Sequence, residues 1–501
     1  MAITLGAVGN AALVPSQKQA TLSTNYIDFT DASTDHWAQQ YMPDLVAQES
    51  EIFGNRTISG FLSKVSAEEA MSADQVIWTE QGRLHLSYKC HIQSAGSYSG
   101  TTSTHTVIEL DKTIDGKLVG EGATQDHGVR VGDTVLVANA NHVAKGYVVS
   151  IDASNTERLT VAAYGGTHLE TVISSGATTS ETMTLLVYGS EYAKGTDKRE
   201  AAVEPTMTSY DNKPIILKDQ YHVSGSDASQ IGWIEVAGEG GQSGYLWYLK
   251  AEGDTRTRFT DYVEMSMLEA EKGVDGTAGV NDVVALGGSA AATAGNMGTE
   301  GMFKAIETRG NVGSGLTAAG NFVLQDFDDI LTRFDEQGAI EEYMMYVDRN
   351  LSLAMDDMLA TINSGYSGGT SYGVFDNDKD MALNLGFSGF RRGSYDFYKT
   401  DWKYLNDKGA RGGMIFNDIK GAMIPAGVSS VYDQTLGRNL KRPFLHVRYR
   451  ASKMENRKLK TWTTGSVGGN VTSALDAMEM HYLSERCLVT QGANNFMLLK
   501  A

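Results

Sequence analysis

The sequence predicts an α+β fold that carries a small inserted all-β domain. First, residues 104–195 follow a strand pattern almost throughout, with short apolar runs separated by turn residues. Second, residues 245–272 and 339–363 place apolar side chains at helical steps of three and four. Third, the chain has 501 residues. A single hydrophobic core stops growing at about 250–300 residues, so we expect more than one domain.

Composition disfavours several classes of protein. The formal net charge is −19, and such a surface repels phosphate, which argues against a general nucleic-acid binder. The mean hydropathy is −0.26, and no run of about 18 apolar residues exists to cross a bilayer. The first residues lack the basic segment of a secretory signal. The two cysteines, Cys90 and Cys487, lie far apart. We therefore expect a chain that stays in the cytosol without a disulfide framework.

The N-terminal region, residues 1–75, is predicted to be an arm followed by the first helices. Residues 1–35 are small and polar, which is typical of an extended segment and not of a core. Residues 36–72 show two loose apolar faces, the second of them around Phe61. Ser66 precedes an alanine and two glutamates, an arrangement that favours a helix N-terminus. We therefore expect two helices within 36–72.

Residues 76–200 are predicted to be a strand region that contains a small barrel-like domain at about 104–195. Strand-type alternation begins in residues 76–92. Five further short strands, separated by turn residues, then follow within about 85 residues, which indicates a compact barrel or sandwich. We expect these strands at 107–110, 129–137, 147–151, 159–164 and 183–188.

Residues 201–244 are predicted to form a long projecting hairpin, with strands at 214–223 and 231–236 joined by a polar connection. An isolated hairpin is marginal in water, so we expect its faces to be covered by other subunits. Trp233 either packs on its own hairpin or anchors into a neighbour, and the sequence leaves both readings open. The candidate assembly residues are Ile216, Lys218, Tyr221, Val223, Trp233 and Ile234.

Residues 245–320 are predicted to contain a long helix and a Gly- and Ala-rich loop, and residues 321–501 to form an α+β half. The long helix covers about 245–272, and Gly273 can end it in the left-handed conformation. Further along the chain we expect amphipathic helices at 325–337 and 339–363 and short strands at 413–416, 444–449 and 487–490.

We predict no catalytic residue, no cofactor site and no metal site. The sequence has no GxxxxGK[ST] phosphate loop, GxSxG elbow or HExxH pair, and its ten histidines are scattered. Asp376, Asp378 and Asp380 alternate as in a calcium loop, but Phe387 stands where the bidentate glutamate belongs, which favours a solvated acidic loop. A glycan hydrolase needs paired carboxylates in a cleft, and 61 acidic residues leave that alternative open.

Several stretches, taken with the order of the parts, carry a resemblance to one family. Residues 189–199 leading to 218–225 resemble the approach to an extended loop, and 245–250 through 261–264 resemble the entry to a long spine helix. Residues 131–135 with 159–161 resemble an inserted β domain, and 485–495 resemble a closing segment. These features resemble the Hong Kong 97-type major capsid proteins of tailed bacteriophages, and most of all those of the crAss-like phages of gut bacteria.

The resemblance implies how the parts are named and what they do. Residues 1–75 would be the N-arm and first helices, 201–244 the E-loop, 245–320 the spine helix and P-domain, and 321–501 the A-domain with a return to the P-domain. Subunits would assemble as hexamers and pentamers into an icosahedral shell around packaged double-stranded DNA. The protein would be structural and not an enzyme.

The resemblance also implies partners and location. The chain would bind other copies of itself, a portal, a scaffold and auxiliary or decoration proteins, and would enclose DNA without sequence-specific binding and without a membrane. It would act in the host cytoplasm during assembly and in the virion capsid afterwards. The sequence marks no lysine and asparagine pair for crosslinking and no sure protease site.

Two rival structural roles remain. An encapsulin-like compartment has the same fold and encloses protein cargo, but the extra β domain argues against it. A phage tail protein would also be Gly-rich and contain strands, but the long amphipathic helices argue against it.

Overall fold

The computed structural model describes residues 60–62, 67–83, 86–93, 105–119, 127–165, 169, 181–196, 207–229, 236–237, 243–244, 247–273, 298–315, 324–337, 340–365, 389–426, 428–433, 438–467 and 471–501. Two compact units are present: one combines Met1–Ile77 with Asp211–Ala501, and the other is Trp78–Tyr210. The predicted arm, Trp233, Ile234 and the acidic residues at 376–380 lie outside the described residues. None of the described helices is both long and apolar enough to cross a membrane.

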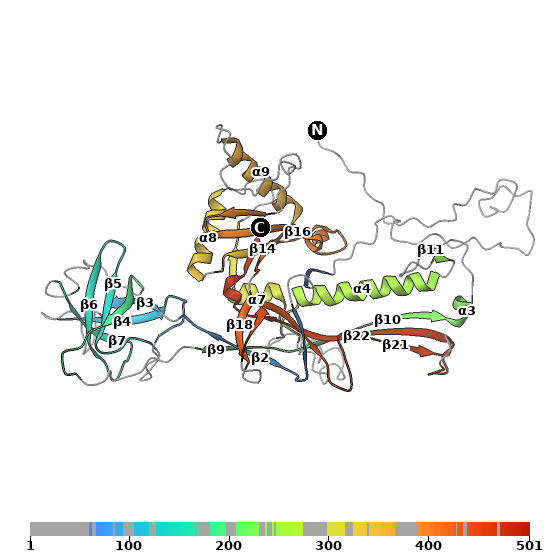
Figure 1. The fold of residues 1–501 in the computed structure, drawn as a ribbon, viewed down its shortest axis with the longest axis horizontal. Helices are drawn as coiled ribbons and strands as arrows, with labels where there is room; N and C mark the ends of the chain where they lie inside the picture. The colour runs from blue at the N-terminus through green and yellow to red at the C-terminus, as the bar shows by residue number, and fades with distance from the viewer. Residues whose placement is uncertain are drawn as a thin grey trace, which may run out of the picture. The chain divides into compact units, whose positions relative to one another are not determined.

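The unit Trp78–Tyr210 is built around a closed barrel (Figure 1). The strands pair in the order β3-β4-β7-β6-β5-β8, and β8 closes on β3. Each of the five strands expected between 107 and 188 overlaps an observed strand. Their bounds are β3 (Ser87–Ile92), β4 (Thr106–Thr113), β5 (Asp133–Ala138), β6 (Val143–Ile151), β7 (Arg158–Ala163) and β8 (Met183–Ser190).

Alternate residues of these strands fill the barrel interior with small and branched side chains. Cys90, Ile108, Val135 and Leu159 are all fully buried in this core. Burial raises the pKa of the Cys90 thiol well above its usual range, which keeps it neutral and unreactive. The chain enters this unit along β2 (Val76–Gln81) and leaves it along β9 (Met207–Asn212), and these two strands pair with each other.

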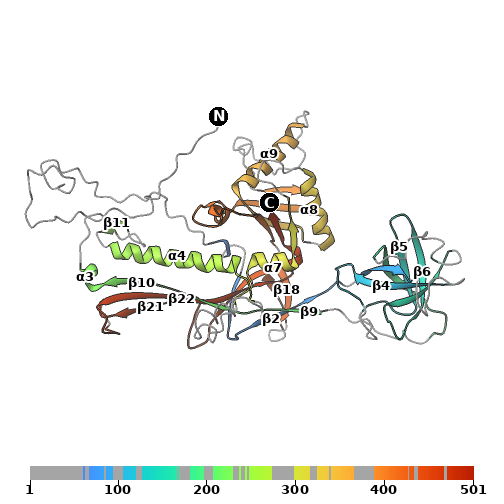
Figure 2. The ribbon, with the colours of Figure 1, turned by 180° about the vertical axis from the view of Figure 1, so that it is seen from behind.

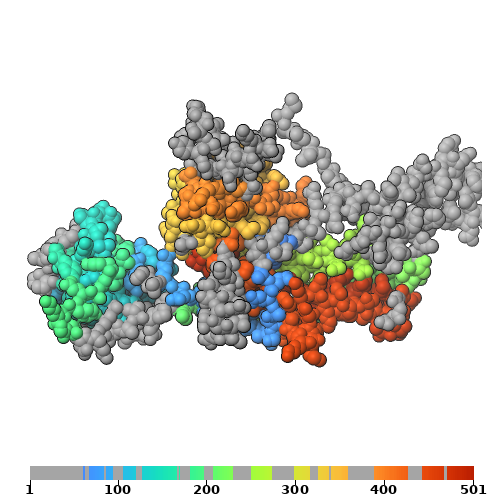
Figure 3. Space-filling model, viewed as in Figure 1, coloured from blue at the N-terminus to red at the C-terminus, as the bar shows by residue number. Residues whose placement is uncertain are grey.

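The other unit contains a sheet whose strands run in the order β1-β20-β22-β10, with β21 also paired to β22. The bounds are β1 (Ala67–Met71), β10 (Ile215–Ser224), β20 (Leu445–Arg450), β21 (Lys460–Gly465) and β22 (Ala477–Thr490). Helix α4 (Trp247–Glu269) lies along this sheet (Figures 1 and 3). Its Phe259 and Val263 pack against Tyr482 of β22. The long helix predicted at 245–272 is therefore confirmed.

A mixed sheet of six strands forms the second layer of this unit, in the order β13-β23-β17-β14-β16-β15. One face packs against α8 and α9, and the other packs against α7 (Figure 2). The helix predicted at 325–337 is confirmed as α8. The bounds are α7 (Met302–Arg309), β13 (Asn311–Gly313), α8 (Leu324–Gln337), β14 (Glu342–Val347), α9 (Arg349–Gly365), β15 (Gly389–Arg392), β16 (Tyr395–Asp401), β17 (Ile419–Pro425) and β23 (Met497–Lys500).

Short elements connect these layers. Two further two-stranded sheets pair β11 with β12 and β18 with β19. The bounds are α3 (Gly225–Ala228), β11 (Val236–Ala237), β12 (Ser243–Gly244), α10 (Lys403–Asn406), η3 (Arg411–Gly413), β18 (Val428–Asp433), β19 (Arg438–Pro443) and η4 (Ala493–Asn495).

The helix predicted at 339–363 is wrong in its first part. Residues Glu342–Val347 form β14, a central strand that pairs with β16 on one side and β17 on the other. The helix begins only at Arg349, because Asp348 caps it: the Leu351 N–H donates to Asp348 Oδ1 at 2.7 Å. The apolar residues of this segment fit both a strand and a helix period, and pairing within the sheet decides between them.

Two other local predictions are also wrong. Residues Ala67–Met71 form strand β1 and not a helix, because they pair in parallel with β20 and Glu69 forms an ion pair with Arg448 at 2.9 Å. Residues 413–416 form no strand. Turn hydrogen bonds hold this segment instead, with the Met414 N–H donating to the Arg411 carbonyl at 3.1 Å.

The predicted pairing of the hairpin strands is corrected as well. Strand β10 falls where the first hairpin strand was expected, but its partner is β22, which it meets in an unbroken antiparallel register from Ile215↔Arg486 to Ser224↔Ala477. The partner lies near the C-terminal end of the chain. β10 is thus part of a packed sheet, and α4 covers one of its faces.

Candidate assembly surface

Strand β10 places the predicted contact residues on two different faces. Leu217 packs against the cluster formed by α4 and β22, and Val223, six positions further on the same face, is 2% exposed. Ile216 and Lys218 lie on the opposite face and are exposed to solvent. Val223 therefore belongs to this chain's own core, whereas Ile216 and Lys218 are available to another molecule.

Tyr221 lies on the covered face of β10 and is half-buried. Burial, followed by the nearby Asp227 and Glu252 carboxylates, raises the pKa of the Tyr221 phenol. The same strand is joined to α4 by charge, because the Arg258 guanidinium donates to Asp219 Oδ2 from Nη2 at 2.9 Å and from Nε at 3.2 Å. Strand and helix are thus linked by apolar packing and by an ion pair.

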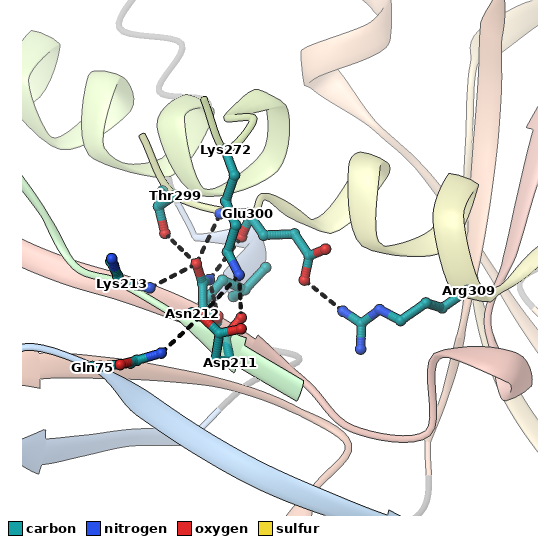
Figure 4. Close-up of polar contacts among 9 residues, drawn as sticks. Gln75, Asp211, Asn212, Lys213, Lys272, Thr299, Glu300 and Arg309 are labelled. Carbon is teal, nitrogen blue, oxygen red and sulfur yellow. Dashed lines mark hydrogen bonds and ion pairs between the residues drawn. The ribbon is translucent and has the colours of Figure 1, made fainter. Parts of the chain in front are cut away.

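A buried asparagine fixes the start of β10 (Figure 4). Asn212 is fully buried, and its Nδ2 donates to the carbonyls of Glu300 at 3.0 Å and Leu488 at 2.6 Å. Its Oδ1 accepts from the Lys213 N–H, the Glu300 N–H and the Thr299 hydroxyl, at 2.9–3.0 Å. Both amide donors and the acceptor are therefore used. One side chain ties β9, β22 and the segment before α7 together.

Charged groups surround this asparagine (Figure 4). Lys272, just beyond α4, donates to the Asp211 carbonyl and lies 3.2 Å from Asp211 Oδ2, which also accepts from Gln75 Nε2 at 3.0 Å. Burial alone would raise the pKa of the Asp211 carboxyl, but the bonds from Lys272 and Gln75 outweigh it and hold that pKa below its usual range. Glu300 in turn pairs with Arg309 of α7 at 2.5 Å.

The described start of the chain is held by a buried carboxylate of α4. Glu264 accepts from the N–H groups of Gly60 at 2.6 Å and Leu62 at 3.0 Å. Between them, Phe61 stacks on Trp402 at 4.6 Å between ring centroids. Burial raises the pKa of Glu264, and the bonds from the backbone N–H groups offset this only in part. Residues 60–62 are therefore fixed to the body of this unit.

Three consecutive apolar side chains, Met414, Ile415 and Phe416, form an exposed apolar turn. Ile415 is fully exposed, and the other two are more than half exposed. The preceding Gly413 packs so closely that an added Cβ would lie 2.0 Å from the Lys408 carbonyl oxygen. Close packing at Gly413 thus restricts the backbone of the turn, while its three side chains are largely exposed to solvent.

Arg411 holds both ends of this apolar turn. Its Nη1 donates to both carboxylate oxygens of Glu269 at 2.6 Å, and Nη2 donates to Asp418 Oδ1 at 2.8 Å. Its Nε donates to Asn417 Oδ1 at 3.1 Å. Burial acts to raise the pKa of Asp418, but Lys500 and Arg411 outweigh it and lower that pKa. The charged network is therefore complete at neutral pH.

The sequence alone does not identify the apolar turn as an exposed contact surface. Its three apolar residues predict a short strand, because apolar runs of this length suit a strand. The pair Gly412 and Gly413 was the available signal for a turn.

The described residues offer few features that could hold a metal ion or a small molecule. Among the described residues no group of three or more His, Cys, Asp or Glu side chains is placed to hold a metal ion. A groove of about 260 Å³ lies between α4 and the sheet, lined by Arg256, Trp462, Met480 and their neighbours. Ligand pockets usually measure about 300–1,000 Å³, so this groove is small for a substrate site.

Among known proteins, the chain is similar to solved structures only at low sequence identity. No protein-family model matches the chain, and no curated protein matches it. It is similar to the asymmetric unit of the bacteriophage PhiM1 mature capsid, with a TM-score of 0.38 and 7% identity over 97% of this chain and 98% of that chain. It is also similar to the capsid of a native GTA particle, with a TM-score of 0.35 and 10% identity over 91% and 94% of the two chains. For the capsid of the cyanophage P-SCSP1u the TM-score is 0.33 and the identity 11%, over 63% of this chain and 80% of that chain. The mixed helix-and-strand chain resembles solved phage capsid structures.

Proposed function

We propose that this protein is a structural subunit that assembles with copies of itself, as hexamers and pentamers, into an icosahedral shell around packaged double-stranded DNA. The order of elements supports this proposal. A long strand, a long helix on its sheet and a mixed α+β layer follow one another in the order that the capsid resemblance implies. On this proposal β10 and the residues after it are the E-loop, α4 is the spine helix, and the six-stranded sheet is the centre of the A-domain.

The apolar turn is the single observation that carries the self-assembly part of the proposal. Interface hot spots are rigid, well-packed anchors near the centre of a contact. Met414, Ile415 and Phe416 are large and apolar, and Arg411 fixes their backbone before any partner arrives. The exposure of three adjacent large apolar side chains to water is unfavourable, and such patches mark interaction sites. Burial against another copy removes that cost.

The finer assignments belong to the same proposal. Ile216 and Lys218 are proposed as E-loop contacts, together with Trp233 and Ile234. A portal, a scaffold and decoration proteins are the proposed partners, and the virion capsid, after assembly in the host cytoplasm, is the proposed location. The protein is proposed to work without catalysis.

Electron microscopy of the purified chain, alone and with a co-expressed scaffold, tests the proposal. Closed shells or ring-shaped capsomers are expected. A chain that stays monomeric under all these conditions contradicts it. The contents of purified shells separate the proposal from the encapsulin-like alternative, because DNA is expected from a capsid and protein cargo from a compartment. Long tubes would instead indicate a tail protein.

A further inference from the structure

The outer surface of the six-stranded barrel carries a cluster of tyrosines that is separate from the shell contacts proposed above. Tyr164 and Tyr188 are each 52% exposed, Tyr192 is also exposed, and Tyr147 is partly so. All four belong to the unit Trp78–Tyr210. We call Tyr147, Tyr164, Tyr188 and Tyr192 the tyrosine platform.

Strand register brings these residues to one side of the barrel. On β6, Ala144 and Val148 face the core, so Tyr147 between them faces outward. Tyr147 is paired with Ala162 on one side and Thr134 on the other. Both neighbours are small, so neither covers the tyrosine ring.

The remaining members extend the platform on both sides of Tyr147. Tyr164 follows β7 directly, and its N–H donates to the Lys145 carbonyl at 3.1 Å. On the far side, Thr134 pairs with Gly189, next to the outward-facing Tyr188. Tyr164 thus lies at the end of β7, beside Tyr147 on β6, and Tyr188 lies on β8, with β5 and its Thr134 between β6 and β8. Neighbouring strands are about 4.8 Å apart.

Hydrogen bonds and close packing hold the platform in place. The Tyr164 hydroxyl donates to the Glu191 carboxylate, and the Glu191 N–H donates to the Gly132 carbonyl at 3.0 Å. Gly132 has a φ of +92°, and an added Cβ would lie 2.7 Å from the Tyr192 ring. A glycine is therefore required for Tyr192 to lie over this turn. The Tyr192 hydroxyl donates to the Val131 carbonyl at 3.3 Å.

The chemistry of the platform favours a sugar as its ligand. Aromatic rings on a rigid sheet offer flat apolar faces to the C–H groups of a pyranose ring, while their hydroxyls remain polar. Glu191 accepts hydrogen bonds from hydroxyl groups, and the exposed Lys145 beside Tyr164 can donate them. The OB-fold, a small five-stranded barrel, binds oligosaccharides on one face of its strands and the adjoining loops. The Glu191 carboxylate and the net charge of −19 disfavour an anionic sugar.

We propose that the tyrosine platform binds an uncharged polysaccharide, with Tyr147 and Tyr188 stacking on sugar rings and Glu191 accepting from their hydroxyls. The site lies on one folding unit, so binding does not depend on shell assembly. A loss of sugar binding and a loss of shell assembly are therefore detected in different experiments.

Native gels that contain dextran, mannan, xylan or the anionic alginate test this proposal with the full-length chain. At least one of the three neutral polysaccharides is expected to retard the native chain. The dependence of the retardation on polysaccharide concentration gives a Kd. Tyr188→Ala should raise this Kd by about 2- to 10-fold, the range for one aromatic contact. Tyr188→Phe should keep most of the affinity, because the ring face remains. Tyr398→Ala, which removes an equally exposed tyrosine from the other unit, should change nothing.

Three results would overturn the proposal. The native chain could pass all three neutral gels without retardation, it could respond only to alginate, or Tyr188→Ala could bind as tightly as the native chain. If Tyr188→Ala instead lowers particle yield without any effect on sugar binding, the platform is a protein contact. A circular-dichroism melt of each variant checks that the barrel is intact.

Discussion

Gln75 and Asp211 are 136 positions apart in the chain, yet Gln75 Nε2 donates to Asp211 Oδ2 at 3.0 Å. Gln75 lies just before β2, and Asp211 lies in β9, so the two residues join the segments that lead into and out of the unit Trp78–Tyr210. Lys272 binds the same carboxylate from the end of α4. The segments before and after the barrel unit are thus bound to each other and to the end of α4.

Asn212→Ala should destabilise the unit that contains α4. The buried Leu488 carbonyl and Glu300 N–H would each lose their partner, and buried unpaired groups cost about 1–3 kcal/mol each. We expect a loss of roughly 2–4 kcal/mol in the free energy of unfolding, measured by urea denaturation. Gln220→Ala, at an exposed position of β10, is the control and should stay within about 0.5 kcal/mol of the native chain. Equal stability of both variants would contradict the role given to Asn212.

Residues 78–210 should fold when expressed alone, because they contain all six barrel strands. A β-type circular-dichroism spectrum and a cooperative melt are expected. Residues 104–195 lack β3, which pairs with both β4 and β8. This shorter piece should therefore melt without cooperativity. If the two fragments behave alike, closure of the barrel by β3 does not stabilise it.

The stability of the chain should depend on pH through Glu264. Its pKa is raised in the folded state by burial, so the folded chain holds this proton more tightly than the unfolded chain. The contribution to stability is complete below the ordinary value of 4.5 and is lost as the pH rises through the folded-state pKa. Glu264→Gln removes this titration. The native free energy of unfolding should therefore fall relative to that of the variant as the pH rises above about 4.5. Parallel curves would show that Glu264 does not titrate differently on folding.

Val223→Ala and Ile216→Ala should separate folding from assembly. Val223 is buried in this chain, and its truncation should cost about 1.5–3 kcal/mol of stability. Ile216 is exposed on the other face of the same strand. Its truncation should leave the melting temperature nearly unchanged and reduce particle yield. A fall in melting temperature for Ile216→Ala with normal assembly would show that this face is not a contact.

The sequence predicts correctly those parts of the fold in which the local hydrophobic pattern fits only one kind of secondary structure. The stripe of α4, the period of α8 and the alternation of the barrel strands each fit a single element. The segment that forms β14 fits two periods, and only its neighbours β16 and β17 decide for a strand. The strand that pairs with β10 could not be predicted from neighbouring residues, because Ile215 pairs with Arg486, which is far away in the sequence.

The candidate surface was predictable only in part. Ile216 and Lys218, two of the six candidate assembly residues, are exposed on one face of β10. Val223, another of the candidates, is buried on the opposite face of the strand, the face on which Leu217 packs against α4. The apolar turn escaped prediction because its exposure depends on Arg411, whose partners Glu269 and Asp418 come from separate elements.

The central claim is that exposed apolar residues on a fixed turn join copies of this chain, and particle counting of Ile415→Asp tests it most directly. Ile415 touches only solvent in the single chain, so the melting temperature should match that of the native chain. Electron microscopy should then show few or no shells or capsomers. Val143→Asp, a similar change at an exposed barrel position, should assemble normally. An Ile415→Asp chain that forms as many particles as the native chain would contradict the account.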